Sequence, residues 1–160
     1  QIKILDIGSG LGVFLAQIKL QTDWICTAIE PDPAMAKHIS EDLNIQTYND
    51  DFRVLDLDLR YNIISLNKVL EHVEKPTELL SLCKRILDEN GFIYIEVPDG
   101  QCAAEDKLGF GREEFFMEHH HAFSVNSTKK MIESAGFELI NIETIKEPST
   151  KYTIRAFLKT

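Results

Sequence analysis

The sequence predicts an α/β protein with a doubly wound, mostly parallel seven-stranded sheet that has one antiparallel strand near the edge. Apolar runs of strand length alternate with segments of helical period, which is typical of repeated strand-helix-strand units. The last two strand-like runs are separated by only a few residues, so they must be antiparallel, because a parallel pair needs a crossover of a dozen or more residues. A chain of 160 residues with 44% apolar residues is expected to form a single domain over 1–160.

The first half of the chain predicts four strands and two helices. The first run is nearly continuous in Ile and Leu, as expected of a strand buried on both faces. The strands are expected over 2–8, 24–30, 44–48 and 61–67. Leu11, Phe14, Leu15 and Ile18 stand at helical spacing and predict a helix over 11–20. Asp32 is the expected N-cap of the next helix, with Pro33 at its first position.

The second half predicts two helices, three strands and one long connection. Pro76 opens a helix for which Gly91 is expected to supply a left-handed stop. Asn126 is expected to cap the last helix and Gly136 to end it. The strands are expected over 92–98, 137–145 and 152–159. Residues 99–123 are expected to form an irregular insertion on the substrate side, because a loop of that length in a compact domain is usually functional.

Composition excludes several classes of function. A net charge of −9 opposes nucleic-acid binding, which depends on Lys and Arg. The three cysteines are odd in number and lack C-x-x-C spacing, so they predict neither a disulfide framework nor a zinc site. No apolar run approaches the ~20 residues of a membrane span. These features indicate a cytoplasmic protein without a membrane span. Residue 1 stands at the start of a strand, so an N-terminal helix is expected to be missing.

The glycine-rich stretch "LDIGSGLG" (5–12) follows the first strand directly. In open parallel sheets, ligands bind beyond the carboxyl ends of the strands, where such a turn lets backbone N–H groups approach the ligand. A dinucleotide fingerprint, G-x-G-x-x-G, would need glycine at position 13, which is Val13. The turn instead reads D-x-G-x-G-x-G, from Asp6 to Gly12.

With this turn, the segments "AIEPDP", "NDDF" and "YNIISLNKVLEHVEKPTELLSLCKRILDENGFIYIEVP" make the chain similar to class I S-adenosylmethionine-dependent methyltransferases. The likeness covers essentially the whole chain, although Asn62 replaces the usual acidic residue. It implies a Rossmann-like methyltransferase fold and S-adenosylmethionine (SAM) as cofactor. Glu30 would bind the ribose hydroxyls, while Asp51 and Phe52 would surround the adenine. The remaining cofactor-binding residues implied by the likeness are Asp6, Gly8, Ser9, Gly10, Gly12 and Asn67. Asp6 has the alternative role of orienting the glycine turn, and Asn67 that of capping the next helix.

The run "EFFMEHHHAFS" (114–124) resembles the "EHxxxFS" stretch of a subset of these enzymes, in which a histidine contacts substrate or acts as base. Histidine suits proton removal at neutral pH. In an extended segment His119 and His121 share a face, so one of them is the expected catalytic base. The alternatives are a solvated loop or hydrogen-bonded packing. Metal binding is a third possibility, since imidazole is a common ligand, but no metal is expected, because the carboxylate cluster of catechol-type enzymes is not evident. His72 in "LEHV" is interpreted as structural.

The predicted function is transfer of a methyl group from SAM to an oxygen or carbon of a small molecule, such as a sugar, natural-product or quinone-like acceptor. Phe110, Phe115 and Phe116 are expected either to wall the acceptor pocket or to form the apolar underside of a loop. Two other functions remain open: an NAD(P)-dependent oxidoreductase domain, and a non-catalytic methyltransferase-like binding module.

Overall fold

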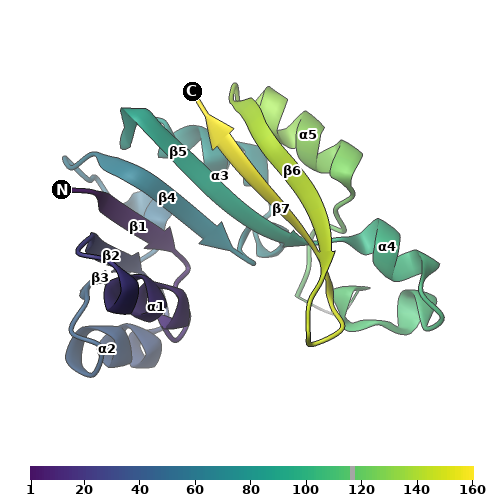
Figure 1. The fold of residues 1–160 in the computed structure, drawn as a ribbon, viewed down its shortest axis with the longest axis horizontal. Helices are drawn as coiled ribbons and strands as arrows, with labels where there is room; N and C mark the ends of the chain where they lie inside the picture. The colour runs from purple at the N-terminus through teal and green to yellow at the C-terminus, as the bar shows by residue number, and fades with distance from the viewer. Residues whose placement is uncertain (116–117) are drawn as a thin grey trace.

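A computed structural model describes residues 1–115 and 118–160, and these form one seven-stranded sheet in the order β3-β2-β1-β4-β5-β7-β6 (Figure 1). The strands are β1 (Lys3–Ile7), β2 (Ile25–Ile29), β3 (Gln46–Tyr48), β4 (Tyr61–Asn67), β5 (Leu87–Pro98), β6 (Glu138–Lys146) and β7 (Tyr152–Lys159). The helices are α1 (Val13–Gln21), α2 (Pro33–Glu41), α3 (Pro76–Cys83), α4 (Gly100–Glu105) and α5 (Val125–Ser134). Only β7 runs against its neighbours, so the predicted fold class is confirmed.

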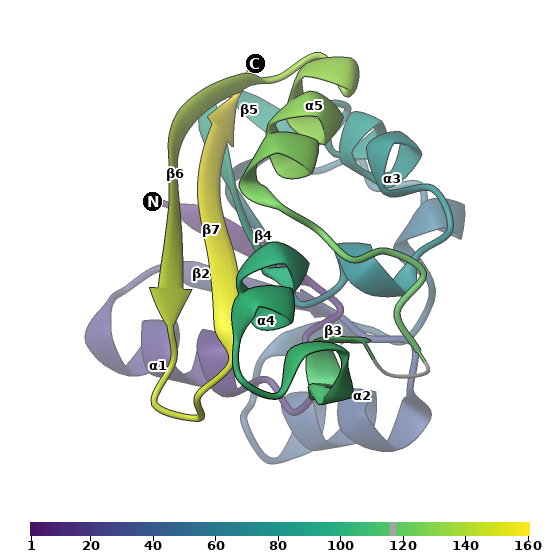
Figure 2. The same ribbon diagram turned by 90° about the vertical axis from the view of Figure 1, so that its right-hand side faces the viewer.

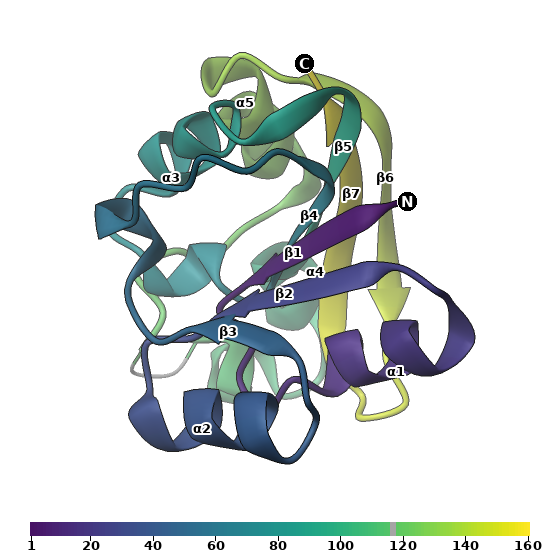
Figure 3. The ribbon, with the colours of Figure 1, turned by 90° about the vertical axis from the view of Figure 1, so that its left-hand side faces the viewer.

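Helices cover both faces of the sheet, and each face has its own apolar core. Successive residues of β1 point to opposite faces, so that Ile4 packs with Leu15 of α1 and Ile39 of α2, whereas Leu5 packs with α3 and α5. Figure 3 shows α1 and α2 together beside β2 and β3, and α3 and α5 together at the other end. This two-sided burial explains why the central strands read as continuous apolar runs.

The boundary between α3 and β5 differs from the prediction. The helix ends at Cys83, and a turn follows in which Ile86 N donates to Cys83 O at 3.2 Å. Leu87 then pairs with Tyr61 and begins β5, five residues before the expected start. Gly91 is therefore no helix stop, and its φ lies outside the left-handed region. It is needed because a Cβ there would lie 2.8 Å from the backbone oxygen of Asn62.

The helix ends follow simple capping chemistry. Asp32 caps α2 as predicted, since its side chain accepts from the N–H groups of Ala34 and Met35. The cap of α5 is Ser124 and not Asn126, because Ser124 and Ser127 form a reciprocal capping box. Gly136 follows α5 with a φ of +73°, as predicted.

The glycine turn extends further than the sequence indicated. Gly8, Gly10 and Gly12 all have positive φ, so α1 begins only at Val13. Leu11 therefore lies outside the helix and is 57% exposed.

The 99–123 connection is more regular than predicted. It contains α4 and two 3₁₀ turns, Gly109–Gly111 and Glu113–Phe115, and Figure 2 shows α4 beside the start of β7. Phe116, one of the aromatics expected near the acceptor, lies outside the described residues. In the described part of the chain, every helix is too short or too polar to cross a membrane.

A buried ion pair fixes this connection to the hairpin formed by β6 and β7. The Arg112 guanidinium lies 2.8 Å from Glu114 Oε1 and also donates to the backbone oxygen of Thr150. Glu114 in turn accepts from the N–H of Tyr152 at 3.2 Å. The segment that carries the histidine run is thus attached to the edge of the sheet.

Candidate active site

The glycine turn is held against the end of β2. The backbone N–H groups of Gly8 and Ser9 both donate to Ile29 O, at 2.8 and 3.2 Å. Gly8 has a φ of +70°, and a Cβ there would lie 2.7 Å from Cγ2 of Val69. A Cβ on Gly10 would instead meet nothing within 4 Å. The turn is therefore packed tightly at Gly8 and open at Gly10.

Glu30 connects the glycine turn to the start of α2. Its side chain is 6% exposed, and its two oxygens accept from Gly10 N at 2.7 Å and from Asp32 N at 2.9 Å. A carboxylate offers about four lone-pair sites, so both oxygens can accept a further hydrogen bond from a ligand.

Asp6 lies beneath the turn and organises the end of β4. Its Oδ1 accepts from Ser65 Oγ at 2.6 Å and from Asn67 Nδ2 at 3.0 Å. Burial raises the pKa of Asp6 to about 6, although hydrogen bonds from Ser65, Ser9 and Asn67 oppose the shift. The Asp6 carboxylate thus accepts hydrogen bonds from β4 side chains. The backbone oxygen of Asp6 accepts a hydrogen bond from Ser9 Oγ of the glycine turn.

A cleft of about 320 Å³ opens at the carboxyl ends of β1, β2 and β4. Four of the residues expected to bind cofactor line it, namely Gly8, Glu30, Asp51 and Phe52. Ser9, Gly10 and Gly12 lie in the turn beside it, and Asp6 and Asn67 bond to each other instead of lining it. The lining also includes Lys68, Val69 and His72, for which no cofactor contact was predicted.

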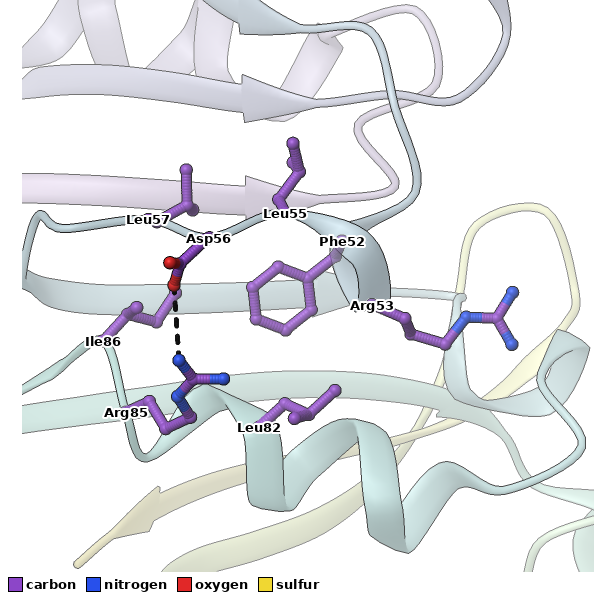
Figure 4. Close-up of a pocket in the computed structure, with 8 residues that line it drawn as sticks. All are labelled: Phe52, Arg53, Leu55, Asp56, Leu57, Leu82, Arg85 and Ile86. Atoms are coloured by element: carbon purple, nitrogen blue, oxygen red, sulfur yellow. Dashed lines mark hydrogen bonds and ion pairs between the residues drawn. The ribbon is translucent and has the colours of Figure 1, made fainter.

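Two residues from the loop after β3 close one side of the cleft. Asp51 accepts from the backbone N–H of Arg53 at 2.8 Å, and hydrogen bonds from the Arg53 side chain lower the pKa of Asp51. Phe52 is 7% exposed and belongs to the larger core. Figure 4 shows its ring also facing a small void between this loop and α3, near the ion pair of Arg85 with Asp56. At about 30 Å³ that void holds about one water molecule, so it is a packing gap.

A second cavity of about 300 Å³ adjoins the cleft, and we call it the acceptor cavity. The two spaces share Lys68 and His72. The acceptor cavity is lined by Lys68, Glu71, His72, Pro98, Glu113, Glu114, His119, Glu147, Lys151 and Tyr152. Its two lysines are paired with carboxylates, since Lys68 lies 3.2 Å from Glu147 and Lys151 lies 3.1 Å from Glu113.

The structure separates the two candidate catalytic histidines. His119 lines the acceptor cavity, and its ring packs edge-on against that of His72 with centroids 4.8 Å apart. His121 is absent from the described lining of both cavities; its Nε2 lies 3.2 Å from Glu74 O and its ring packs on Phe123.

The predicted aromatic wall is also absent from these linings. Phe110 is 77% exposed and packs on Phe115, with ring centroids 5.0 Å apart. Among the described residues, the pair therefore fits the apolar underside of a loop better than a pocket wall.

Of the ten residues that line the acceptor cavity, only His119 was predicted as a site residue, and Glu71, His72 and Lys68 are among the others. Glu71 is only 1% exposed, and burial raises the pKa of its carboxyl. His72 stands in the "LEHV" stretch, and this motif is the sequence signal that could have identified it as a site residue. Lys68 has no such local signal, and the contacts of its side chain with the β6–β7 hairpin place it in the site.

Comparison with known proteins gives a family match over most of the chain. Residues 1–142 match the family model described as a methyltransferase domain. A curated relative, the ubiquinone biosynthesis O-methyltransferase of Glaesserella parasuis serovar 5 (strain SH0165), is 26% identical over 106 residues. That alignment covers 58% of this chain and 44% of the relative, so the chain spans less than half the length of the curated protein.

Solved structures share the fold at low identity. A SAM-dependent methyltransferase from Clostridium acetobutylicum ATCC 824 has a TM-score of 0.77 and 12% identity, covering 98% of this chain and 83% of the other. The plantazolicin methyltransferase BpumL, solved with a triazolic desmethylPZN analog and SAH, has a TM-score of 0.82 and 16% identity, covering 99% of this chain and 77% of that one. At such identities these likenesses establish the fold alone.

Proposed function

The chain belongs to the methyltransferase domain family, and we propose that it transfers a methyl group from SAM to an oxygen of a small molecule bound in the acceptor cavity. Our sequence prediction allowed an oxygen or a carbon acceptor, and the name of the curated O-methyltransferase relative favours oxygen. The alternative of a dinucleotide-dependent oxidoreductase has no support from the family match.

The observation that carries this proposal is that the cleft and the acceptor cavity adjoin at Lys68 and His72. Methyl transfer is an in-line displacement that needs the nucleophile and the methyl carbon at about 3–3.5 Å. Two neighbouring spaces, one for each reactant, would allow such an approach where they adjoin. Residues 113, 114 and 119 come from the 99–123 connection, which supports its proposed role on the acceptor side.

The residues of the cleft suit the proposed cofactor. Glu30 has lone pairs for two ribose hydroxyls, and the open space at Gly10 lets a ligand approach the backbone of the turn. Phe52 and Asp51 provide an apolar surface and a hydrogen-bond acceptor for the adenine. When bound, SAM would supply an electrophilic methyl group.

His119 is the residue that we propose to receive the acceptor's proton. It lines the acceptor cavity, and its Nδ1 lies 3.0 Å from the backbone oxygen of Glu114, which orients the ring. An oriented imidazole with a reference pKa near 6.5 suits proton removal at neutral pH. His121 is oriented toward Glu74 and serves as its control.

Calorimetry with SAM and with S-adenosylhomocysteine tests the cofactor site. We expect sub-millimolar binding to the wild type, weakened about 10- to 150-fold by Glu30→Gln, because the amide forfeits a charge-assisted hydrogen bond of about 1.5–3 kcal/mol. Glu41→Gln is the matched control, since Glu41 is an exposed residue of α2 paired with Lys37. Failure of both ligands to bind the wild type, or wild-type affinity in Glu30→Gln, would contradict the proposal.

Transfer of a labelled methyl group to a panel of phenols, catechols and sugars tests the base. His119→Ala should reduce turnover about 100- to 10,000-fold, the usual contribution of general base catalysis, while SAM affinity stays unchanged. His121→Ala should retain turnover. Equal losses in the two variants, or none in His119→Ala, would refute this assignment.

A further inference from the structure

We propose that Glu71, His72 and His119 form a binding site for a divalent transition-metal ion such as Zn²⁺ in the wall of the acceptor cavity. One carboxylate oxygen and one ring nitrogen from each histidine lie within 4.8 Å of one another. All three residues line the cavity. Two histidines and one glutamate are a known ligand set of catalytic zinc, which keeps a further position for water or substrate.

The two imidazoles are oriented as metal ligands usually are. Nδ1 of His72 lies 3.0 Å from Glu118 O, and Nδ1 of His119 lies 3.0 Å from Glu114 O. A backbone oxygen can only accept, so each Nδ1 carries the proton and each Nε2 presents a lone pair. Metal-binding histidines commonly donate their other ring N–H to a backbone carbonyl in this way. Within the described residues, neither Nε2 has a hydrogen-bond partner.

Glu71 supplies the second, independent observation. Its side chain is 1% exposed, and Oε2 has no hydrogen-bond partner among the residues that the structure describes. An unpaired buried carboxylate is costly, and buried charges in proteins are normally paired or coordinate a metal. The backbone oxygen of Glu71 also accepts from His120 N at 2.8 Å, which fixes the histidine run against the turn that carries Glu71 and His72.

The geometry requires only a small adjustment. Bonds of about 2.1 Å in a tetrahedral site place ligand atoms about 3.4 Å apart. Atoms that lie within 4.8 Å of one another must therefore approach by at most about 1.4 Å, through rotation of the side chains. The nearby Lys68 ammonium offers little opposition, because it is paired with Glu147 at 3.2 Å. Nitrogen ligands favour zinc and related ions over Mg²⁺, which prefers oxygen.

The chemical consequence rests on the proposed function. An ion held by these residues would face the acceptor cavity with one open position, so it would select acceptors whose hydroxyl can reach that position. The same Nε2 of His119 cannot bind the ion and receive a proton. In the metal-loaded protein His119 would therefore be a ligand; the ion would lower the pKa of the bound hydroxyl, and the proton of that hydroxyl would pass to solvent.

Equilibrium dialysis with Zn²⁺, and the visible absorption of Co²⁺, test the site in the full chain. We expect one ion per chain at micromolar concentration, with affinity reduced at least tenfold in Glu71→Gln and in His119→Ala. His120→Ala and His121→Ala are matched controls from the same histidine run and should bind as wild type. The absence of binding to the wild type, equal losses in the controls, or wild-type binding by Glu71→Gln would overturn the proposal.

Two further measurements distinguish loss of the metal site from misfolding of the variant and from failure of the proposed function. At a Zn²⁺ concentration near the wild-type dissociation constant, the ion should raise the melting temperature of the wild type more than that of Glu71→Gln, because the folded variant binds it more weakly. SAM affinity without metal should be equal in all these variants. Zinc binding without SAM binding would refute the proposed function but support the ion site. SAM binding without zinc binding would refute the ion site but leave the proposed function standing.

Discussion

The substitution Gly8→Ala tests whether the glycine turn is held by packing against Val69. Gly8 has a φ of +70°, and a left-handed conformation costs a residue with a side chain about 1–2 kcal/mol. The new Cβ would also lie 2.7 Å from Val69 Cγ2, closer than real Cβ contacts allow. Overpacking of this kind costs about 1–3 kcal/mol. Together the two effects predict a loss of about 2–5 kcal/mol in the free energy of unfolding.

Equilibrium unfolding in urea measures this loss of unfolding free energy. Two further variants separate the backbone cost from the packing cost. Gly10→Ala meets nothing within 4 Å at a φ of +55°, so it should show only the backbone cost. The double variant Gly8→Ala, Val69→Ala removes the clash and should show a favourable coupling of about 1–3 kcal/mol relative to the single variants. If Gly8→Ala costs no more than Gly10→Ala, or if the coupling is absent, the packing argument is wrong.

Two other predictions concern stability. Burial raises the pKa of Asp6 from 3.8 to about 6, so the folded state holds a proton that the unfolded chain releases between these values. Wild-type stability should thus fall relative to Asp6→Asn by roughly 3 kcal/mol as pH rises from 4 to above 6, and a pH-independent difference in urea unfolding would contradict this. Gly91→Ala should lose about 1–3 kcal/mol because its Cβ would lie 2.8 Å from Asn62 O, whereas Gly111→Ala, with nothing within 4 Å, should be neutral or slightly stabilising. Equal melting temperatures for the two glycine variants would refute that contrast.

Most of the fold could be predicted because a central strand that is buried on both faces of the sheet consists of a continuous apolar run, which is easily recognised in the sequence. The prediction was wrong where two patterns overlap, at the end of α3. Ile86 and Leu87 continue the helical spacing of Leu79, Leu80 and Cys83, yet both are buried beyond the helix. Pairing of Leu87 with Tyr61 decides the structure there, and that partner lies 26 residues earlier in the sequence. Local periodicity carries no information about such a contact.

The residues that line the cleft could be predicted better than those that line the acceptor cavity, because local sequence patterns say more about strand ends than about distant contacts. Gly8 and Glu30 follow directly after adjacent parallel strands, so chain order alone brings them to one edge of the sheet. The acceptor cavity instead needs the turn Leu70–His72, the histidine run and the β6–β7 hairpin to meet. The sequence pattern did not distinguish His119 from His121, whereas in the structure His119 contacts the backbone of Glu114 and His121 contacts that of the distant Glu74.

Lys68 explains how the two spaces come to adjoin. It follows β4 with a φ of +57°, which is uncommon outside glycine and is maintained only where the surroundings hold it. Its N–H donates to Glu96 O at 3.0 Å, and its ammonium is paired with Glu147. The chain reverses at this residue, so that Val69 packs against Gly8 while the following turn carries Glu71 and His72 into the acceptor cavity. The backbone strain at Lys68 therefore lies at the junction of the cleft and the acceptor cavity, where the proposed function requires the methyl group to be transferred.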